Sequence, residues 1–350
     1  MQMIKEKQRN LRKQIAPYEK ADIKNSVLQM INTFVPFFVL WILAYKSLSI
    51  SFWLTLIISI PAAGFLTRIF IIFHDCCHQS FFKNKKYNKI LGTITGVLTL
   101  FPYNQWKHSH SVHHATSSNL DKRGTGDIWV LTVDEYAAAP LSKRIAYRIY
   151  RNPFIMFGIG PVYEFLIKNR FNRKGARMKE RMNTYLTNVL IASAVAFFCW
   201  ALGWEAFLLV QGPIFLISGS MGIWLFYVQH QFEDSYFEED ENWDYVKAAV
   251  EGSSFYRLPK IMQWLTGNIG YHHVHHLSPR VPNYKLEAVH ENTLPLHNVP
   301  TITLMTSLTS LRFRLWDEKD KKFVGYKAAY EKRRNTKASN RIISRKADLN

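Results

Sequence analysis

The sequence predicts an all-α integral membrane protein, with four transmembrane helices in two hairpins and a helical cap on the cytoplasmic face. Two observations predict this fold. Four apolar runs approach the length of about 20 residues that a helix needs to cross the hydrocarbon core. They occupy residues 27–45, 51–73, 185–202 and 206–228. Only residues 46–50 and 203–205 join the members of each pair, so each pair predicts a tight helical hairpin.

The distribution of basic residues orients the hairpins. Residues 1–26 form a basic N-terminal arm, and the segment between the second and third runs is also rich in Lys and Arg, whereas the hairpin tips contain only Lys46. Because basic loops remain on the cytoplasmic side, we expect both termini and the central segment in the cytoplasm and the protein in the plasma membrane. The N-terminus lacks the apolar core of a secretory signal. Three cysteines do not suggest a disulfide framework, which indicates a reducing compartment.

The formal net charge of +19 calls for an anionic partner surface. Nucleic acid and anionic lipid are the usual candidates. No nucleic-acid-binding motif accompanies the charge, whereas membrane-spanning runs do, so we expect lipid headgroups and not nucleic acid. The mean hydropathy of −0.13 resembles that of a soluble protein only because apolar runs alternate with basic segments.

Residues 27–316 are expected to form one membrane domain, followed by a charged C-terminal tail, residues 317–350, that is loosely ordered. Two further apolar stretches, residues 90–103 and 154–167, are short and contain Gly or Pro. If either crossed the membrane alone, the histidine clusters described next would lie on opposite sides. We therefore expect both stretches to be interfacial or partly buried helices.

Ten of the 13 histidines lie in three compact clusters: HDCCH at residues 74–78, HSHSVHH at 108–114 and HHVHH at 272–276. Side chains three or four residues apart share one face of a helix, so each cluster can present several imidazoles to one point. An eleventh histidine, His230, lies at the cytoplasmic end of the fourth apolar run. The eight cluster histidines with this spacing are His74, His78, His110, His113, His114, His272, His275 and His276.

Eight or nine imidazoles indicate two metal ions, because a structural zinc takes four ligands and a catalytic zinc three. Imidazole binds Zn, Cu, Fe and Ni alike, but many neutral ligands at a membrane surface favour redox iron and O2 chemistry. Cys76 and Cys77 do not share the spacing of His74 and His78 and are expected to be packing residues. No nucleotide, haem or iron–sulfur motif is present, so electrons are expected from a small donor of the ferredoxin or flavodoxin type.

Residues 25–316 resemble the membrane fatty-acid desaturase family, whose boxes read H-x(3-4)-H, H-x(2-3)-H-H and H/Q-x(2-3)-H-H. Here these are HDCCH, HSVHH and HHVHH, in contexts such as RIFIIFHDCCHQSFF, FYVQHQFED and NIGYHHVHHLSPRVPNYKL. The last is most similar to Δ5 acyl-lipid desaturases of Bacillus-type bacteria. The resemblance implies that the eight box histidines, with His230 as a ninth, hold two iron ions. It also implies that this di-iron centre uses O2 to introduce a cis double bond into saturated acyl chains of membrane phospholipids.

The chain departs from the family pattern at some positions. The stearoyl-CoA branch has an Asn four positions before the counterpart of His230, where this chain has Phe226, so an amide contact cannot be carried over. His108 and His273 fall outside the boxes. Metal-bound histidines usually donate their second N–H to a carboxylate or carbonyl. The carboxylate candidates are Asp75, Asp127, Glu233, Asp234 and Glu287.

Two other functions remain as alternatives. A di-iron membrane hydroxylase would share the boxes, although the hydrocarbon hydroxylases that we compare have a glutamate-rich second box and an Asn…Glu-His-Tyr motif, both absent here. A histidine-rich metal transporter usually places its ligands near the bilayer midplane, whereas these clusters lie beyond the run ends. His290 and His297 are expected to be surface residues, Trp129 and Trp264 membrane anchors, and Arg68 a residue without a catalytic role.

Overall fold

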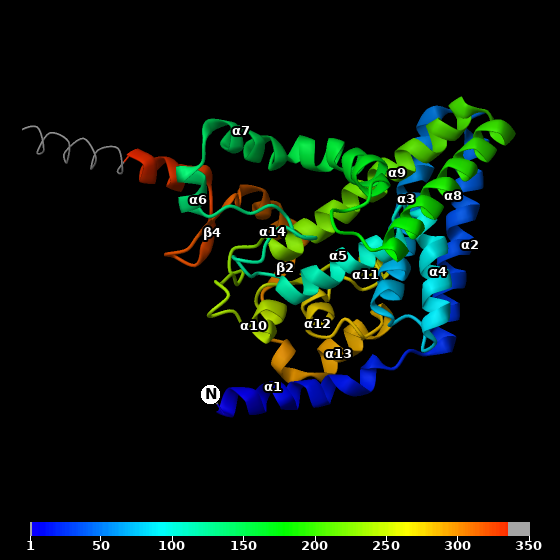
Figure 1. The fold of residues 1–350 in the computed structure, drawn as a ribbon. Helices are drawn as coiled ribbons and strands as arrows, with labels where there is room; N and C mark the ends of the chain where they lie inside the picture. The colour runs from blue at the N-terminus through cyan, green and yellow to red at the C-terminus, as the bar shows by residue number, and fades with distance from the viewer. Residues whose placement is uncertain (1, 335–350) are drawn as a thin grey trace, which may run out of the picture.

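The computed structural model describes residues 2–334, and these are mostly helical (Figure 1). The longer α-helices are α1 (Gln2–Ile15), α2 (Ile23–Ser47), α3 (Phe52–His78), α4 (Lys85–Leu98), α5 (Tyr103–Thr116), α7 (Leu141–Tyr150), α8 (Met178–Leu202) and α9 (Trp204–His230). The shorter α-helices are α6 (Val133–Ala138), α10 (Tyr245–Val250), α11 (Lys260–Leu265), α12 (His272–Leu277), α13 (Leu286–Asn292) and α14 (Leu304–Ser307).

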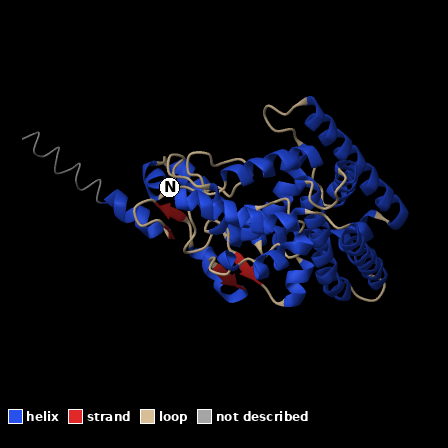
Figure 2. Cartoon of the chain, turned by 90° about the horizontal axis from the view of Figure 1, so that it is seen from below, coloured by secondary structure: helices blue, strands red, loops and turns tan. Residues whose placement is uncertain are grey.

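Strands are confined to two short pairs among the helices (Figure 2). The parallel pair is β1 (Phe255–Arg257) with β2 (Thr301–Thr303), and the antiparallel pair is β3 (Leu315–Asp317) with β4 (Lys322–Val324). The remaining helical turns are η1 (Ala16–Glu19), η2 (Ile155–Ile159), η3 (Val162–Ile167), η4 (Lys168–Arg170), η5 (Asn283–Lys285), η6 (Leu294–Leu296) and η7 (Leu308–Arg312).

Four helices of the described chain, α2, α3, α8 and α9, are long and apolar enough to cross a membrane. Each contains 25 or 27 residues and extends beyond its predicted run, because polar residues continue the helix past the apolar stretch. The α2–α3 and α8–α9 turns lie together at one end of the bundle (Figure 1). The predicted two-hairpin, four-helix architecture is confirmed.

The helix α3 is the central element of the bundle. Of the 18 most apolar consecutive residues of α3, 61% are buried, compared with 22% for α2 and for α9 and 6% for α8. The helix packs against α2, α4 and α9. The Ser51 hydroxyl caps its first turn by accepting a hydrogen bond from Trp53 N, and Pro61 lies within the helix, where packed neighbours tolerate it. This central position carries the first histidine cluster into the interior of the protein.

The two ambiguous apolar stretches form partly buried elements, as predicted. The first becomes α4, which at 14 residues is too short to cross a membrane. It buries Leu91 and Thr95 and exposes Ile90 and Ile94. The second forms the π-helical turns η2 and η3, of which η2 packs against α9.

The prediction of a loosely ordered C-terminal tail is wrong for residues 317–334. These residues continue the β3–β4 hairpin, in which Trp316 pairs with Phe323, and then form a helix at residues 326–334. Both aromatic rings are buried against Phe237, and Ala329 is buried against Leu131. The high charge of this segment concealed its apolar face. The rest of the predicted tail, residues 335–350, lies outside the described residues.

The N-terminal arm contributes a supporting helix. Leu11 and Ile15 of α1 are buried in a cluster with Val274 and Leu277 of α12 and Val289 of α13. Apolar burial of this kind stabilises each side chain by about 1.5–3 kcal/mol. The arm therefore supports α12, which carries the third histidine cluster.

Candidate metal centre

The three clusters and His230 come from four helices that meet at one end of the bundle. The first cluster forms the last turn of α3, the second lies on α5, the third lies on α12, and His230 is the last residue of α9. The left-handed conformation of Gln79, with φ 62°, ends α3 directly after His78. The chain thus turns away from the metal centre as soon as the first cluster is complete.

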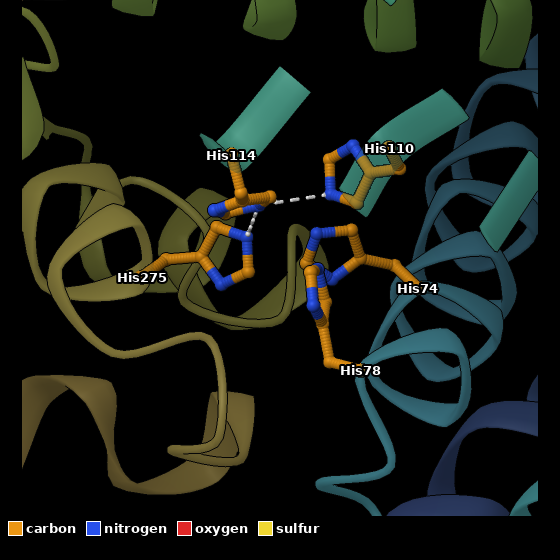
Figure 3. A group of neighbouring side chains, drawn as sticks. All are labelled: His74, His78, His110, His114 and His275. Atoms are coloured by element: carbon orange, nitrogen blue, oxygen red, sulfur yellow. Dashed lines mark hydrogen bonds between the residues drawn. The ribbon is translucent and has the colours of Figure 1, made fainter. Parts of the chain in front are cut away.

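Five histidines form the first group, shown in Figure 3. One nitrogen from each lies within 4.8 Å of the others. His114 Nε2 lies 3.1 Å from His110 Nε2 and 2.9 Å from His275 Nε2. The rings point toward a common centre from α3, α5 and α12 (Figure 3). The members are His74, His78, His110, His114 and His275.

A second group contains His113, His230 and His276, again with nitrogens within 4.8 Å of one another. His272 adjoins this group, because its Nε2 lies 2.9 Å from His230 Nε2 and its ring centroid lies 4.5 Å from that of His276. The two groups share a boundary, since the rings of His114 and His276 stack at 4.3 Å. All nine predicted ligands therefore lie in one continuous cluster.

Sequence spacing did not reveal how the clusters divide between the groups. Adjacent residues on an α-helix point about 100° apart around its axis, so His113 and His114 diverge, as do His275 and His276. Each of these pairs sends one imidazole to each group. Only the first cluster sends both its histidines to one group. Helices α5 and α12 therefore contribute to both groups, whereas α3 contributes only to the first and α9 only to the second.

The nitrogens have the chemistry that a divalent metal requires. The Nε2 atoms of His78, His113 and His276 are buried without a hydrogen-bond partner in the protein. Burial lowers the pKa of His114, His275 and His276 well below its ordinary value, and neighbouring imidazoles lower it further. These rings are therefore neutral and can donate a lone pair. Buried, unpaired, neutral imidazole nitrogens fit metal ions such as iron.

The structure distinguishes among the carboxylates that the sequence left unranked. Asp127 Oδ1 lies 2.6 Å from His113 Nδ1, and Asp75 Oδ1 lies 3.2 Å from His74 Nδ1. The second Asp75 oxygen accepts hydrogen bonds from Asn283 N and Nδ2, at 2.7 and 2.8 Å. Glu233, Asp234 and Glu287 are exposed, and Glu287 accepts a hydrogen bond from Tyr271. Asp75 and Asp127 are therefore the two that can orient ligands.

His230 is oriented by a carbonyl oxygen in place of a carboxylate. Its Nδ1 lies 3.1 Å from the oxygen of Gly252, which leaves Nε2 directed at the second group. A side chain on Gly252 would meet the Ser118 hydroxyl at 2.3 Å and the oxygen of Ala248 at 2.6 Å. The glycine is thus required for this close approach, a signal that the sequence contained but that did not stand out beside the clusters.

The histidines left out of the predicted set also lie outside both groups. Neither group includes His108 or His273. His273 is fully buried, and its Nε2 lies 3.0 Å from His290 Nδ1. The prediction that His290 is an ordinary surface residue is wrong, because it is half-buried against His273 and Phe255. His297 is exposed, as predicted.

The remaining residues named from the sequence have packing roles. Cys76 and Cys77 are buried in an apolar cluster with Phe73 and Phe81, as predicted. Arg68 lies with its guanidinium 4.1 Å from the ring centre of Trp264, away from both metal groups.

A small cavity adjoins the second group. His113 and His230 form one wall, and Phe226, Ile128 and Phe237 contribute apolar surface. The Phe226 ring lies 5.1 Å from that of His113 and 5.3 Å from that of His230. Phe226 stands where the stearoyl-CoA branch of the family has an Asn. Its apolar ring therefore lies in front of His113 and His230.

The chain is similar to known proteins over most of its length. The family model described as fatty acid desaturase matches residues 51–304. The chain is 71% identical over 327 residues to a fatty acid desaturase of Bacillus subtilis (strain 168), an alignment that covers 93% of each chain. The chain belongs to the fatty acid desaturase family. It is therefore a multi-pass membrane oxidoreductase.

More distant members of the family match about two thirds of this chain. The sn-1 oleoyl-lipid 12-desaturase of Synechocystis sp. (strain ATCC 27184 / PCC 6803 / Kazusa) is 26% identical over 64% of both chains. The sn-1 acyl-lipid omega-3 desaturase (ferredoxin) of Nostoc sp. (strain 36) is 26% identical over 65% of this chain and 64% of that protein. In this fatty acid desaturase the first histidine box ends α3, the second and third lie on α5 and α12, and His230 ends α9.

Proposed function

We propose that this desaturase introduces a cis double bond into saturated acyl chains of membrane phospholipids, using O2 and a di-iron centre. The observation that carries the proposal is the convergence of nine histidines, from four helices, in two adjacent groups beside the ends of the spanning helices. Neither a single zinc site nor a transport site at the bilayer midplane needs such a double set of neutral ligands.

The first iron would be held by the five histidines of the first group, and the second by His113, His230, His272 and His276. When bound, the iron pair supplies the oxidising power that removes hydrogen from unactivated methylene groups, which no side chain can supply. The protein's residues contribute orientation. Asp127 and Asp75 accept the outer N–H of His113 and His74 and fix which nitrogen faces the metal.

The acyl chain would pass beside the second group. The cavity at Phe226 offers an apolar wall next to His113 and His230, so a methylene segment there would displace water and lie beside the irons. Apolar walls bind an alkyl chain by removing its surface from water. We infer double-bond formation at the Δ5 position and a phospholipid carrier. Support comes from the likeness of the third box to Δ5 acyl-lipid enzymes and from acyl-lipid relatives.

Desaturation is a four-electron reduction of O2 to two water molecules. Two electrons and two protons come from the acyl CH2–CH2 unit as its C=C bond forms, and the other two electrons and protons must come from outside. The described residues include no flavin, haem or iron–sulfur motif, so we infer a small ferredoxin- or flavodoxin-type donor. A relative whose printed name includes ferredoxin supports this inference.

We infer that the protein lies in the plasma membrane with both termini in the cytoplasm. The hairpin tips contain one basic residue, Lys46, whereas the opposite end of the bundle carries the basic N-terminal arm and the basic segment 83–89. Short basic loops are retained in the cytoplasm. The metal centre would then face the reducing cytoplasm, where soluble electron donors are found.

Lipid analysis of a bacterial host expressing the chain tests the function. We expect new monounsaturated acyl chains in the phospholipid fraction by gas chromatography, and mass spectrometry of derivatised double bonds should place them at carbon 5. Hydroxylated acyl chains would support the hydroxylase alternative, and altered cellular metal content without new lipids would support transport. Purified protein that holds stoichiometric zinc but no iron would contradict the di-iron proposal.

The variant His113→Ala should abolish olefin formation, because it removes a ligand of the second group. The matched control is His297→Ala, which changes an exposed histidine outside both groups. We expect the control to retain wild-type product levels. Wild-type product levels in the His113→Ala variant would remove the basis of the ligand assignment.

A further inference from the structure

Two of the nine histidines approach the protein surface. The other seven have between 1% and 6% of their surface exposed, whereas His78 and His110 are partly exposed. Both belong to the first group. Partly exposed Lys107 and exposed Ser111 of α5 flank this region, together with partly exposed Gln79 at the end of α3. Among the nine histidines, His78 and His110 therefore form the exposed edge of the cluster.

Helices α4, α5 and α8 pack against one another beside this exposed edge. We call the basic side chains that they and the segments just before α4 and α8 carry the basic rim. The Lys107 ammonium lies 5.9 Å from the centre of the Tyr103 ring. Burial is the largest cause of the lowered pKa of Lys107, and the nearby positive charges of Lys179 and Lys85 also lower it. Asn104 Nδ2 of α5 bonds the oxygen of Lys179 at 3.2 Å, which fixes the start of α8 beside α5. The rim consists of Lys83, Lys85, Lys86, Lys107, Lys174, Arg177, Lys179 and Arg181.

The charge of the rim is largely uncompensated. Segments 79–116 and 168–183 contain a single acidic residue, Glu180, which is buried and paired with Arg173 and Arg177 at 2.8 and 3.3 Å. Among the described residues, no ion pair involves Lys83, Lys85, Lys86, Lys107, Lys174, Lys179 or Arg181. A field of one sign around a redox centre steers oppositely charged proteins to it.

The opposite flank of the metal centre repels such a partner. The loop after α9 carries a run of carboxylates at Glu233, Asp234, Glu238, Glu239, Asp240, Glu241 and Asp244. Two of these pair with lysines, Asp240 with Lys122 and Glu238 with Lys321, and the others leave the loop acidic. An anionic protein is thus attracted to one flank and excluded from the other, a pattern that specifies orientation.

We propose that an acidic one-electron carrier protein docks on the basic rim and delivers electrons to the first histidine group through the edge at His78 and His110. The proposal rests on the proposed desaturase function. Each docking event transfers one electron and oxidises the carrier, and two events supply the pair that, with two protons, completes the reduction of O2. An anionic phospholipid headgroup is the competing occupant, and the experiment below separates the two.

The test uses the full chain, loaded with iron, in vesicles of uncharged phosphatidylcholine, with reduced plant-type ferredoxin as the donor. The variant Lys85→Glu/Lys179→Glu reverses two rim charges that lie away from the ligands. The control Lys46→Glu/Lys319→Glu makes the same change in net charge at exposed positions, one at a hairpin tip and one on the β3–β4 turn. Iron content and thermal unfolding establish that each variant is folded, and the single variants Lys85→Glu and Lys179→Glu replace the double variant if it is not.

We expect the rim variant to raise the KM for ferredoxin about tenfold or more and to flatten its dependence on salt, while activity with dithionite as reductant is unchanged. The control variant should match the wild type. Binding of oxidised ferredoxin, measured by surface plasmon resonance, should weaken in parallel. This binding measurement does not depend on turnover, so it stands even if the wild-type protein forms no olefin and the proposed function fails.

Three results would overturn the docking proposal. The first is an unchanged KM and unchanged ferredoxin binding in the rim variant. The second is a raised KM for the lipid with an unchanged KM for ferredoxin, which would assign the rim to headgroups. The third is equal loss of activity with ferredoxin and with dithionite in an iron-loaded, folded variant, because a defect shared by both reductants is not one of docking.

Discussion

Asp127 makes the shortest contact between a carboxylate and any of the nine histidines. Its Oδ1 lies 2.6 Å from His113 Nδ1, and its Oδ2 accepts a hydrogen bond from Gly124 N at 3.3 Å. A side chain on Gly126, whose φ is +78°, would meet Ser109 O at 2.8 Å and His113 Cβ at 3.1 Å. The loop thus folds closely against α5 so that one carboxylate reaches one imidazole.

The variant Asp127→Asn keeps the shape of the side chain but removes its negative charge. We expect iron affinity or desaturation to fall about 10–100-fold, the usual cost of losing the partner that orients a metal-bound histidine. Iron content measured by mass spectrometry and product formation measured by gas chromatography check this expectation. The control Asp320→Asn changes an exposed carboxylate on the β3–β4 turn. Full iron content and activity in Asp127→Asn would mean that the contact orients nothing.

At the scale of single elements, α4 controls the geometry of the first histidine cluster from outside. The Tyr103 hydroxyl donates a hydrogen bond to Cys76 O at 2.9 Å, within the turn that joins His74 and His78. Gly92 of α4 lies against the same ring, and an added Cβ would come within 2.4 Å of Tyr103 Cε2 and 3.0 Å of Cys76 Cβ. The glycine lets α4, α5 and α3 approach closely.

The variant Gly92→Val should therefore displace Tyr103 and distort the last turn of α3. We expect a loss of about 1–3 kcal/mol of stability, typical of overpacked sites, together with lower iron content. Thermal unfolding in detergent and metal analysis measure both. Gly212→Val is the matched control, since Gly212 also lies in a helix but has nothing within 4 Å of an added Cβ. Equal melting temperatures for the two variants would show that the close approach is not required.

At the scale of the whole molecule, the two histidine groups bring together parts of the chain that are far apart in sequence. His74 and His275 belong to one group although they lie 201 positions apart in the sequence, and His113, His230 and His276 connect α5, α9 and α12. Without metal, several buried imidazole nitrogens have no partner, which costs about 1–3 kcal/mol each. Bound metal ions would therefore help to hold the cap to the bundle.

Removal of iron by a chelator should lower the melting temperature, and restoring Fe²⁺ should reverse the change, because a ligand that binds only the folded state stabilises it. Differential scanning fluorimetry of the protein before and after chelation measures this effect. The variant His113→Ala should show a smaller response to iron than His297→Ala. A melting temperature that chelation leaves unchanged would indicate that the cap folds without its metals.

The sequence determined the parts of this protein that depend on local pattern. Apolar length specified the four spanning helices, and the four-residue spacing of the histidines specified the pairs that lie together, such as His74 with His78 and His110 with His114. Both follow from the geometry of a single helix, so no tertiary information is needed. At residues 317–334 the high charge concealed a buried apolar face, in which Phe323 packs against Trp316.

The tertiary structure alone decided how the ligands divide between two metal positions and which carboxylates reach them. His275 faces His74 while its neighbour His276 faces His113, because α12 lies between the two groups and turns by about 100° per residue. Asp127 reaches His113, whereas Glu233 and Asp234 remain in solvent. Contacts between distant segments depend on how helices pack, and local pattern in one segment carries no record of that packing.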